Sequence, residues 1–127
     1  MSKTKTPARK KLSPEGTKLK SKWLRALRSG KYNQGTGALC YRVSGTDEKS
    51  YCCLGVLCDV LDPTAWKGTN DLGFKRPQTA IYPPKSVLSL VGLTARSAIK
   101  LAELNDDHRL SFEEIADKIK SGNLDPD

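Results

Sequence analysis

The residue types with the most chemistry to offer are four cysteines, Cys40, Cys52, Cys53 and Cys58. A zinc site usually pairs cysteines across a short spacer, whereas Cys52 and Cys53 are adjacent and would point to opposite faces of a strand. The first residues carry no hydrophobic segment of the kind that a secretion signal requires, so disulfides are not expected. The pattern predicts buried structural thiols, with neither a metal nor another cofactor.

A catalytic thiol is the alternative interpretation of these cysteines. Cys52 or Cys53 would stand where a strand runs into a helix, and a helix N-terminus lowers the pKa of a thiol. The single histidine, His108, follows Asn105 closely, so a Cys-His-Asn arrangement could assemble in space. A histidine in a polar loop between helices is more often solvated. We therefore expect no catalytic residues and no enzyme.

The stretch Gln34-Gly35-Thr36-Gly37 resembles a phosphate-binding loop superficially. It lacks the G-K-[ST] ending, and it precedes a strand instead of following one into a helix. Glycine amides near a basic residue could still hold an anion. This leaves open a small-ligand site, for example one that sequesters a nucleotide signal, formed by Gln34, Gly35, Gly37, Arg42, Asn105 and Asp106.

The clearest pattern is the distribution of charge. Residues 1–31 hold eleven bases and one acid, a net charge of +10, and the remaining residues hold eleven bases and thirteen acids, a net charge of −2. Such clustering is typical of a protein that binds nucleic acid, although a solubilising tail would share it. The expected contacts are Lys3, Lys5, Arg9, Lys10, Lys11, Lys18, Lys22, Arg25 and Arg28.

These basic residues need a structural element to position them. Residues 1–12 have almost nothing to bury and are expected to form a disordered arm. Ser13 caps a helix that ends at Gly30. Apolar residues recur along one side of this helix, while Lys18, Lys22 and Arg25 share the opposite side. One face of the helix should therefore pack on the body and the other should be cationic.

The middle of the chain predicts a hairpin. Residues 38–43 and 50–54 suit two short strands, joined by a polar connection, and residues 55–61 suit a short buried helix. Residues 62–83 mix Pro, Gly, Asn and Thr, which indicates a long loop with at most one short strand near residues 79–82.

Three more helices are expected: one over residues 84–91, one that begins after Thr94 and runs to Asn105, and one with the capping box Ser111-x-x-Glu114. The acidic side of the last helix, Glu113, Glu114 and Asp117, should be solvated. No recognition helix follows it, so it does not read DNA. The fold class is α+β and mostly helical, with about five short helices around a small antiparallel sheet: a single domain over residues 13–122 and an acidic tail at 123–127.

Four blocks of sequence resemble a family of small uncharacterised proteins of tailed bacteriophages and prophages. They are WLRALRSGKYNQGTGALC (residues 23–40), YCCLGVLCDVL (51–61), LAELND (101–106) and SFEEIADKI (111–119). The resemblance implies a protein made in the cytoplasm of an infected bacterium and supplies no catalytic residues. We expect an accessory protein, without membrane association, that binds nucleic acid or a host nucleoprotein or defence complex through its basic head.

Overall fold

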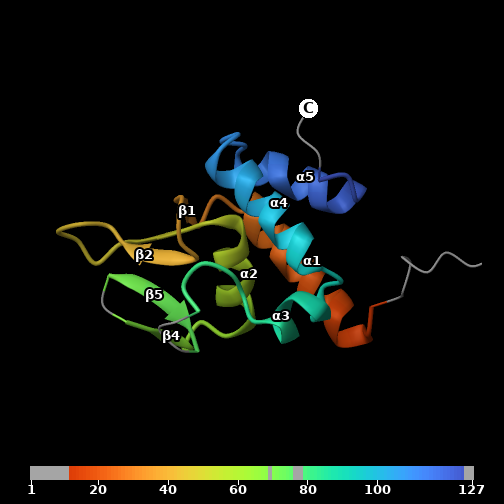
Figure 1. The fold of residues 1–127 in the computed structure, drawn as a ribbon, viewed down its shortest axis with the longest axis horizontal. Helices are drawn as coiled ribbons and strands as arrows, with labels where there is room; N and C mark the ends of the chain where they lie inside the picture. The colour runs from red at the N-terminus through yellow and green to blue at the C-terminus, as the bar shows by residue number, and fades with distance from the viewer. Residues whose placement is uncertain (1–11, 69, 76–78, 125–127) are drawn as a thin grey trace, which may run out of the picture.

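The structure is a computed structural model that describes residues 12–68, 70–75 and 79–124. These residues form five helices and one five-stranded sheet, which confirms the α+β class. Figure 1 shows the sheet on one side of the molecule and most of the helices on the other, with α2 (Cys53–Leu61) between them. Predictions for residues 1–11 and for 125–127 lie outside the described residues.

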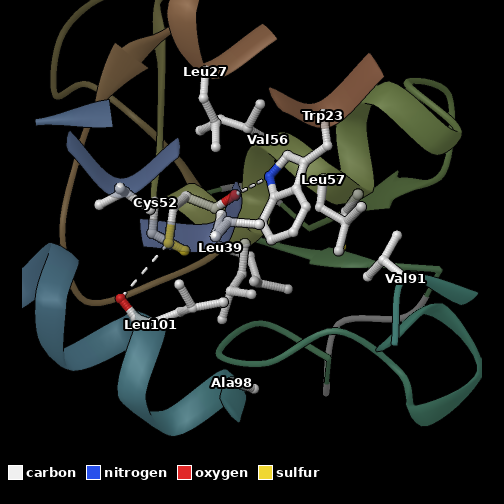
Figure 2. Close-up of a cluster of buried hydrophobic side chains, with 14 of the residues drawn as sticks. Trp23, Leu27, Leu39, Cys52, Val56, Leu57, Val91, Ala98 and Leu101 are labelled. Atoms are coloured by element: carbon white, nitrogen blue, oxygen red, sulfur yellow. Dashed lines mark hydrogen bonds between the residues drawn. The ribbon is translucent and has the colours of Figure 1, made fainter. Parts of the chain in front are cut away.

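Helix α1 spans Pro14–Arg28 and begins as predicted. The Ser13 side chain accepts a hydrogen bond from the Gly16 N–H (3.0 Å), and Gly30 follows the last turn with a φ of 76°. Leu19, Trp23 and Leu27 are buried. The Trp23 indole N–H donates to the Cys53 carbonyl (2.9 Å), so α1 is fixed to the core both by packing and by a directed bond (Figure 2).

The strands are β1 (Asn33–Gln34), β2 (Cys40–Arg42), β3 (Lys49–Tyr51), β4 (Trp66–Lys67) and β5 (Asp71–Phe74). Their order in the sheet is β1-β3-β2-β5-β4. The antiparallel pair of β2 and β3 is the predicted hairpin. β1 adds a parallel pair at one edge, and β5 and β4 continue the sheet in antiparallel fashion on the other side.

Helix α2 spans Cys53–Leu61, and this corrects the prediction of a strand over residues 50–54 and a helix from 55. Such a short apolar run does not reveal its period, so the boundary could not be placed from the sequence. Tertiary contacts set the start of this helix. The Cys53 N–H, which has no partner within the first turn, donates to Asn105 Oδ1 (3.2 Å). Gly55 lies against the Leu39 backbone, where any side chain would overlap the carbonyl.

The prediction for residues 62–83 was also wrong in detail. The chain forms β4 and β5 there, and residues 79–82 form no strand. Residues 79 and 80 nevertheless form hydrogen bonds with the sheet and the segment before β2. The Thr79 carbonyl accepts from the Phe74 N–H (2.8 Å), and the Ala80 carbonyl accepts from the Leu39 N–H (2.8 Å).

The last three helices follow the predictions closely: α3 (Lys85–Leu90), α4 (Ala95–Asp106) and α5 (Phe112–Ser121). Both hydrogen bonds of the Ser111–Glu114 capping box are present. Among the described residues, no helix combines the length and the apolar character needed to cross a membrane.

Candidate functional site

The outer side of α1 carries the predicted basic face. Lys18, Lys22 and Arg25 are exposed, and in the described part of the chain no carboxylate lies within salt-bridge distance of them. Their positions follow from the burial of Leu19 and Trp23 on the other side of the helix. We call Lys18, Lys22 and Arg25 the basic face. The basic residues Lys3, Lys5, Arg9, Lys10 and Lys11 lie outside the described residues.

Arg28, the fourth predicted contact on α1, has a partner. Its guanidinium lies 2.9 Å from the Asp117 carboxylate of α5, and the two side chains are 35% and 69% exposed. An ion pair this exposed contributes little to stability, about 0–1 kcal/mol. Arg28 therefore marks the end of the basic face, where α1 meets the acidic side of α5.

Five of the six residues predicted as a small-ligand site do come together. The Asn105 Oδ1 accepts from Gln34 Nε2 (3.0 Å), and Asn105 Nδ2 donates to the Gly35 carbonyl (2.8 Å) and to Asp106 Oδ1 (2.8 Å). The Gly37 N–H donates to Asp106 Oδ2 (3.2 Å). We call Gln34, Gly35, Gly37, Asn105 and Asp106 the Asn105 cluster.

The sixth residue, Arg42, lies on β2, where it pairs with Lys49 and its backbone N–H donates to the Asn70 carbonyl (3.0 Å). It is therefore part of the sheet, and the hydrogen bonds of the Asn105 cluster run through the other five residues.

The bonding of the Asn105 cluster favours a structural role. Oδ1 of Asn105 accepts two hydrogen bonds, from Gln34 and from the Cys53 N–H, and Nδ2 donates two, so the amide is fully satisfied. The Gly37 amide, which could have faced an anion, already faces the Asp106 carboxylate. A phosphate brought to this loop would meet that negative charge.

The four thiols are buried, as predicted. Cys52 and Cys53 do lie at the start of α2, but the effect of burial on their pKa outweighs that of the helix N-terminus. Burial raises the pKa of Cys52 to about 11 and holds the pKa of Cys53 well above its usual range. Figure 2 shows Cys52 among core side chains, and the Cys53 thiol donates to the Leu101 carbonyl of α4 (3.6 Å).

His108 does not complete a catalytic pair. It is exposed in the connection between α4 and α5, and its backbone N–H donates to the Glu103 carbonyl (3.0 Å). Within the described ranges, no hydrogen bond joins His108 to a thiol. Nor do any three His, Cys, Asp or Glu side chains of these residues gather as they would around a metal ion.

Sequence reasoning missed a row of aromatic rings. Successive ring centroids lie 5.0 Å apart for Tyr32 and Tyr51, 6.1 Å for Tyr51 and Trp66, and 5.4 Å for Trp66 and Phe74, all in edge-to-face contact. Phe74 is buried, whereas the other three are partly exposed. We call these four residues the aromatic row. Their places on the loop after α1, on β3, on β4 and on β5 gave no local signal.

The aromatic row is held by one carboxylate of α2. Asp59 accepts from the Tyr32 hydroxyl (2.7 Å) through one oxygen and from the Trp66 indole N–H (2.9 Å) through the other. Burial first, and then the bond to Asp59 and its negative charge, raise the pKa of Tyr32, so this hydroxyl stays a donor. Asp59 thus fixes the two ends of the exposed part of the row.

A surface depression of about 400 Å³ lies along α5, but its acidic groups are already engaged. Glu114 accepts from the Ser111 N–H (2.9 Å) in the capping box, and Asp117 pairs with Arg28. The lining residues are Leu110, Glu114, Asp117, Lys118, Ser121 and Asn123.

Comparison with known proteins gives a family but no activity. A family model with the description "Domain of unknown function (DUF8296)" matches residues 16–96. The match includes nearly all of α1, the whole sheet, α2 and α3, and so contains the basic face and the aromatic row, while Asn105 lies beyond it. No curated protein and no solved structure is found to match the chain. Since the match spans well over half of the sequence, the chain belongs to the DUF8296 family.

Proposed function

We propose that this protein binds nucleic acid, alone or in a host nucleoprotein or defence complex, through the basic face of α1 and the basic residues that precede it, and that it does so without catalysis. The observation that carries the proposal is the state of Lys18, Lys22 and Arg25. They are exposed together on a helix whose opposite side is anchored in the core by Leu19 and Trp23.

This arrangement suits phosphate binding for an energetic reason. The described residues offer these three cations no carboxylate, so a nucleic acid would not have to displace an internal ion pair. Cations on a rigid helix also lose little conformational freedom of the backbone when they bind. Release of counterions from the phosphates then supplies most of the affinity.

The resemblance of residues 23–40 and 51–61 to proteins of tailed bacteriophages supports a setting for this activity. We place the protein in the cytoplasm of an infected bacterium, as an accessory protein that acts on host machinery or host defences. A small-ligand site at the Asn105 cluster is disfavoured, because the Asn105 amide has no hydrogen-bonding capacity left.

The test compares two charge-matched variants by fluorescence anisotropy with a labelled duplex of generic sequence. The first replaces Lys18, Lys22 and Arg25 with Ala. The second replaces Lys85, Arg96 and Lys120, which are exposed on α3, α4 and α5. The first should weaken binding on the order of tenfold or more, and the second much less.

Equal losses in the two variants would show that only net charge matters and would contradict an interface on α1. Absence of binding by the unaltered protein to both a duplex and a single strand would contradict the proposal as a whole.

A further inference from the structure

The aromatic row offers a surface that the basic face lacks. Tyr32, Tyr51 and Trp66 pack against the core but remain partly exposed, and Asp59 and their mutual edge contacts fix them in place. Large rings that are partly exposed and already ordered lose little entropy when a flat ligand stacks on them. The row begins four residues after the end of α1 in the sequence.

Lysines accompany the rings. Lys31 precedes Tyr32 and is exposed, and Lys49 lies two residues before Tyr51 on β3, which puts both on the same face of the strand. At the far end, the Lys75 ammonium lies 5.8 Å from the centroid of the Phe74 ring. Asp59, the carboxylate at the centre, directs its two oxygens to the Tyr32 hydroxyl and the Trp66 indole N–H.

We propose that the aromatic row stacks the bases of a single-stranded nucleic acid. This inference rests on the proposed function and names its ligand. The phosphates of the single strand would lie along the basic face and the lysines beside the rings, and its unpaired bases would lie on Tyr32, Tyr51 and Trp66. Alternation of aromatic rings and cations is the surface that single strands require, because each nucleotide presents a flat base and a negative charge. A duplex keeps its bases stacked internally and cannot use the rings.

The first measurement uses the unaltered protein and its own tryptophans. Trp23 is fully buried, whereas Trp66 is partly exposed in the row. Stacking of a base on Trp66 should therefore quench part of the tryptophan emission when oligothymidine or oligouridine is added. A duplex of the same length, bound through phosphates alone, should leave the emission nearly unchanged.

The second measurement is the ratio of single-strand to duplex affinity in variants of the row. Tyr51→Leu keeps an apolar side chain but removes the ring, and the ratio should fall about tenfold, the loss of one stacked base. Tyr51→Phe keeps the ring and should therefore keep the ratio of the unaltered protein. Tyr82→Leu removes an exposed ring outside the row and should leave the ratio unchanged.

The outcomes separate the two proposals. Binding that depends on the basic face, with no quenching by oligothymidine or oligouridine and an unaltered ratio in Tyr51→Leu, overturns the aromatic row as a site and keeps the proposed function. Quenching and a lowered ratio, with no effect of neutralising the basic face, keeps the row and overturns the interface on α1. If Tyr51→Leu fails to fold, as a thermal melt would reveal, the quenching of the unaltered protein decides. Absence of binding to every probe overturns both.

Discussion

Asn105 is the residue on which three parts of the chain depend. It is 1% exposed, and its side chain joins the loop at Gly35, the start of α2 at Cys53 and its own neighbour Asp106. A buried amide with all its hydrogen bonds made fixes the geometry of whatever it contacts. The sequence indicated the residues of this cluster through their turn-forming and polar character, but it could not distinguish an internal hydrogen-bonding network from a ligand site.

Loss of the Asn105 amide should destabilise the fold. Asn105→Leu should lower the free energy of unfolding by about 2–4 kcal/mol, because the Gly35 carbonyl and the Cys53 N–H would be left buried without partners. Urea denaturation measures the change. Asn33→Ala, an exposed amide that donates to the Lys49 carbonyl, is the control and should cost well under 1 kcal/mol. Equal costs would contradict the structural role of Asn105.

The buried thiols should make the stability of the protein depend on pH. Burial raises the folded-state pKa of Cys52 to about 11, above the value of about 8.5 for a solvated thiol. Burial likewise raises the pKa of Cys40 to about 11, against the opposing charge of Lys49. The folded state thus holds these protons more tightly than the unfolded state does. The stabilisation of the folded state by these thiol protons is complete below about pH 8.5 and is lost as the pH rises toward 11.

Thermal melts across this range should therefore show a falling melting temperature on the alkaline side. A Cys52→Ala variant, which removes one of the titrating thiols, should show a shallower fall. A melting temperature that stays constant up to about pH 11 would mean that the thiols are more accessible than the structure shows.

Helix α5 is the element that the sequence predicts most completely. Its capping box, its buried positions and its terminal Gly122 are all encoded within a few neighbouring residues. Local signals of this kind survive in a single sequence because they do not depend on the rest of the fold.

The strand β5 shows what local signals cannot provide. Leu72, Gly73 and Phe74 are buried in succession without alternation, and β5 pairs with β2, some thirty residues earlier in the chain. The aromatic row has the same origin, because its rings come from four separate segments. Such features arise from pairing across the chain, and a single sequence carries no periodic pattern for them.

The two faces of α5 should respond differently to substitution. Ile115 is fully buried, so Ile115→Asp places an unpaired charge in the core and should unfold the protein or lower its stability by more than about 4 kcal/mol. Glu113→Ala changes an exposed residue of the same helix and should cost less than about 0.5 kcal/mol. Circular dichroism melts that ranked the two variants in the opposite order would contradict the assigned face.

The separation of charge is the main feature of the molecule as a whole. The first 31 residues carry a net charge of +10 and the rest −2, and the basic part extends onto α1, where it meets the acidic side of α5 at the Arg28–Asp117 pair. The described portion of the chain thus gives the molecule one cationic helix face on a body that is close to neutral.

A prediction for the whole chain follows from this separation. Deletion of residues 1–11 removes five bases, Lys3, Lys5, Arg9, Lys10 and Lys11, and leaves the capping residue Ser13 and the packed residue Leu12 in place. The melting temperature should barely change, whereas the affinity for a nucleic acid should fall. A truncated protein that keeps full affinity would restrict the interface to α1.

The most direct test of the proposed function is a salt titration of binding to a generic duplex. Each phosphate contact contributes about 0.9 to the slope of log K against log salt concentration. Replacing Lys18, Lys22 and Arg25 with Ala should therefore flatten the slope by about 2.7, and replacing Lys85, Arg96 and Lys120 should leave it unchanged. Equal slopes for the unaltered protein and the α1 variant, or no dependence on salt at all, would contradict binding of nucleic acid by the basic face of α1.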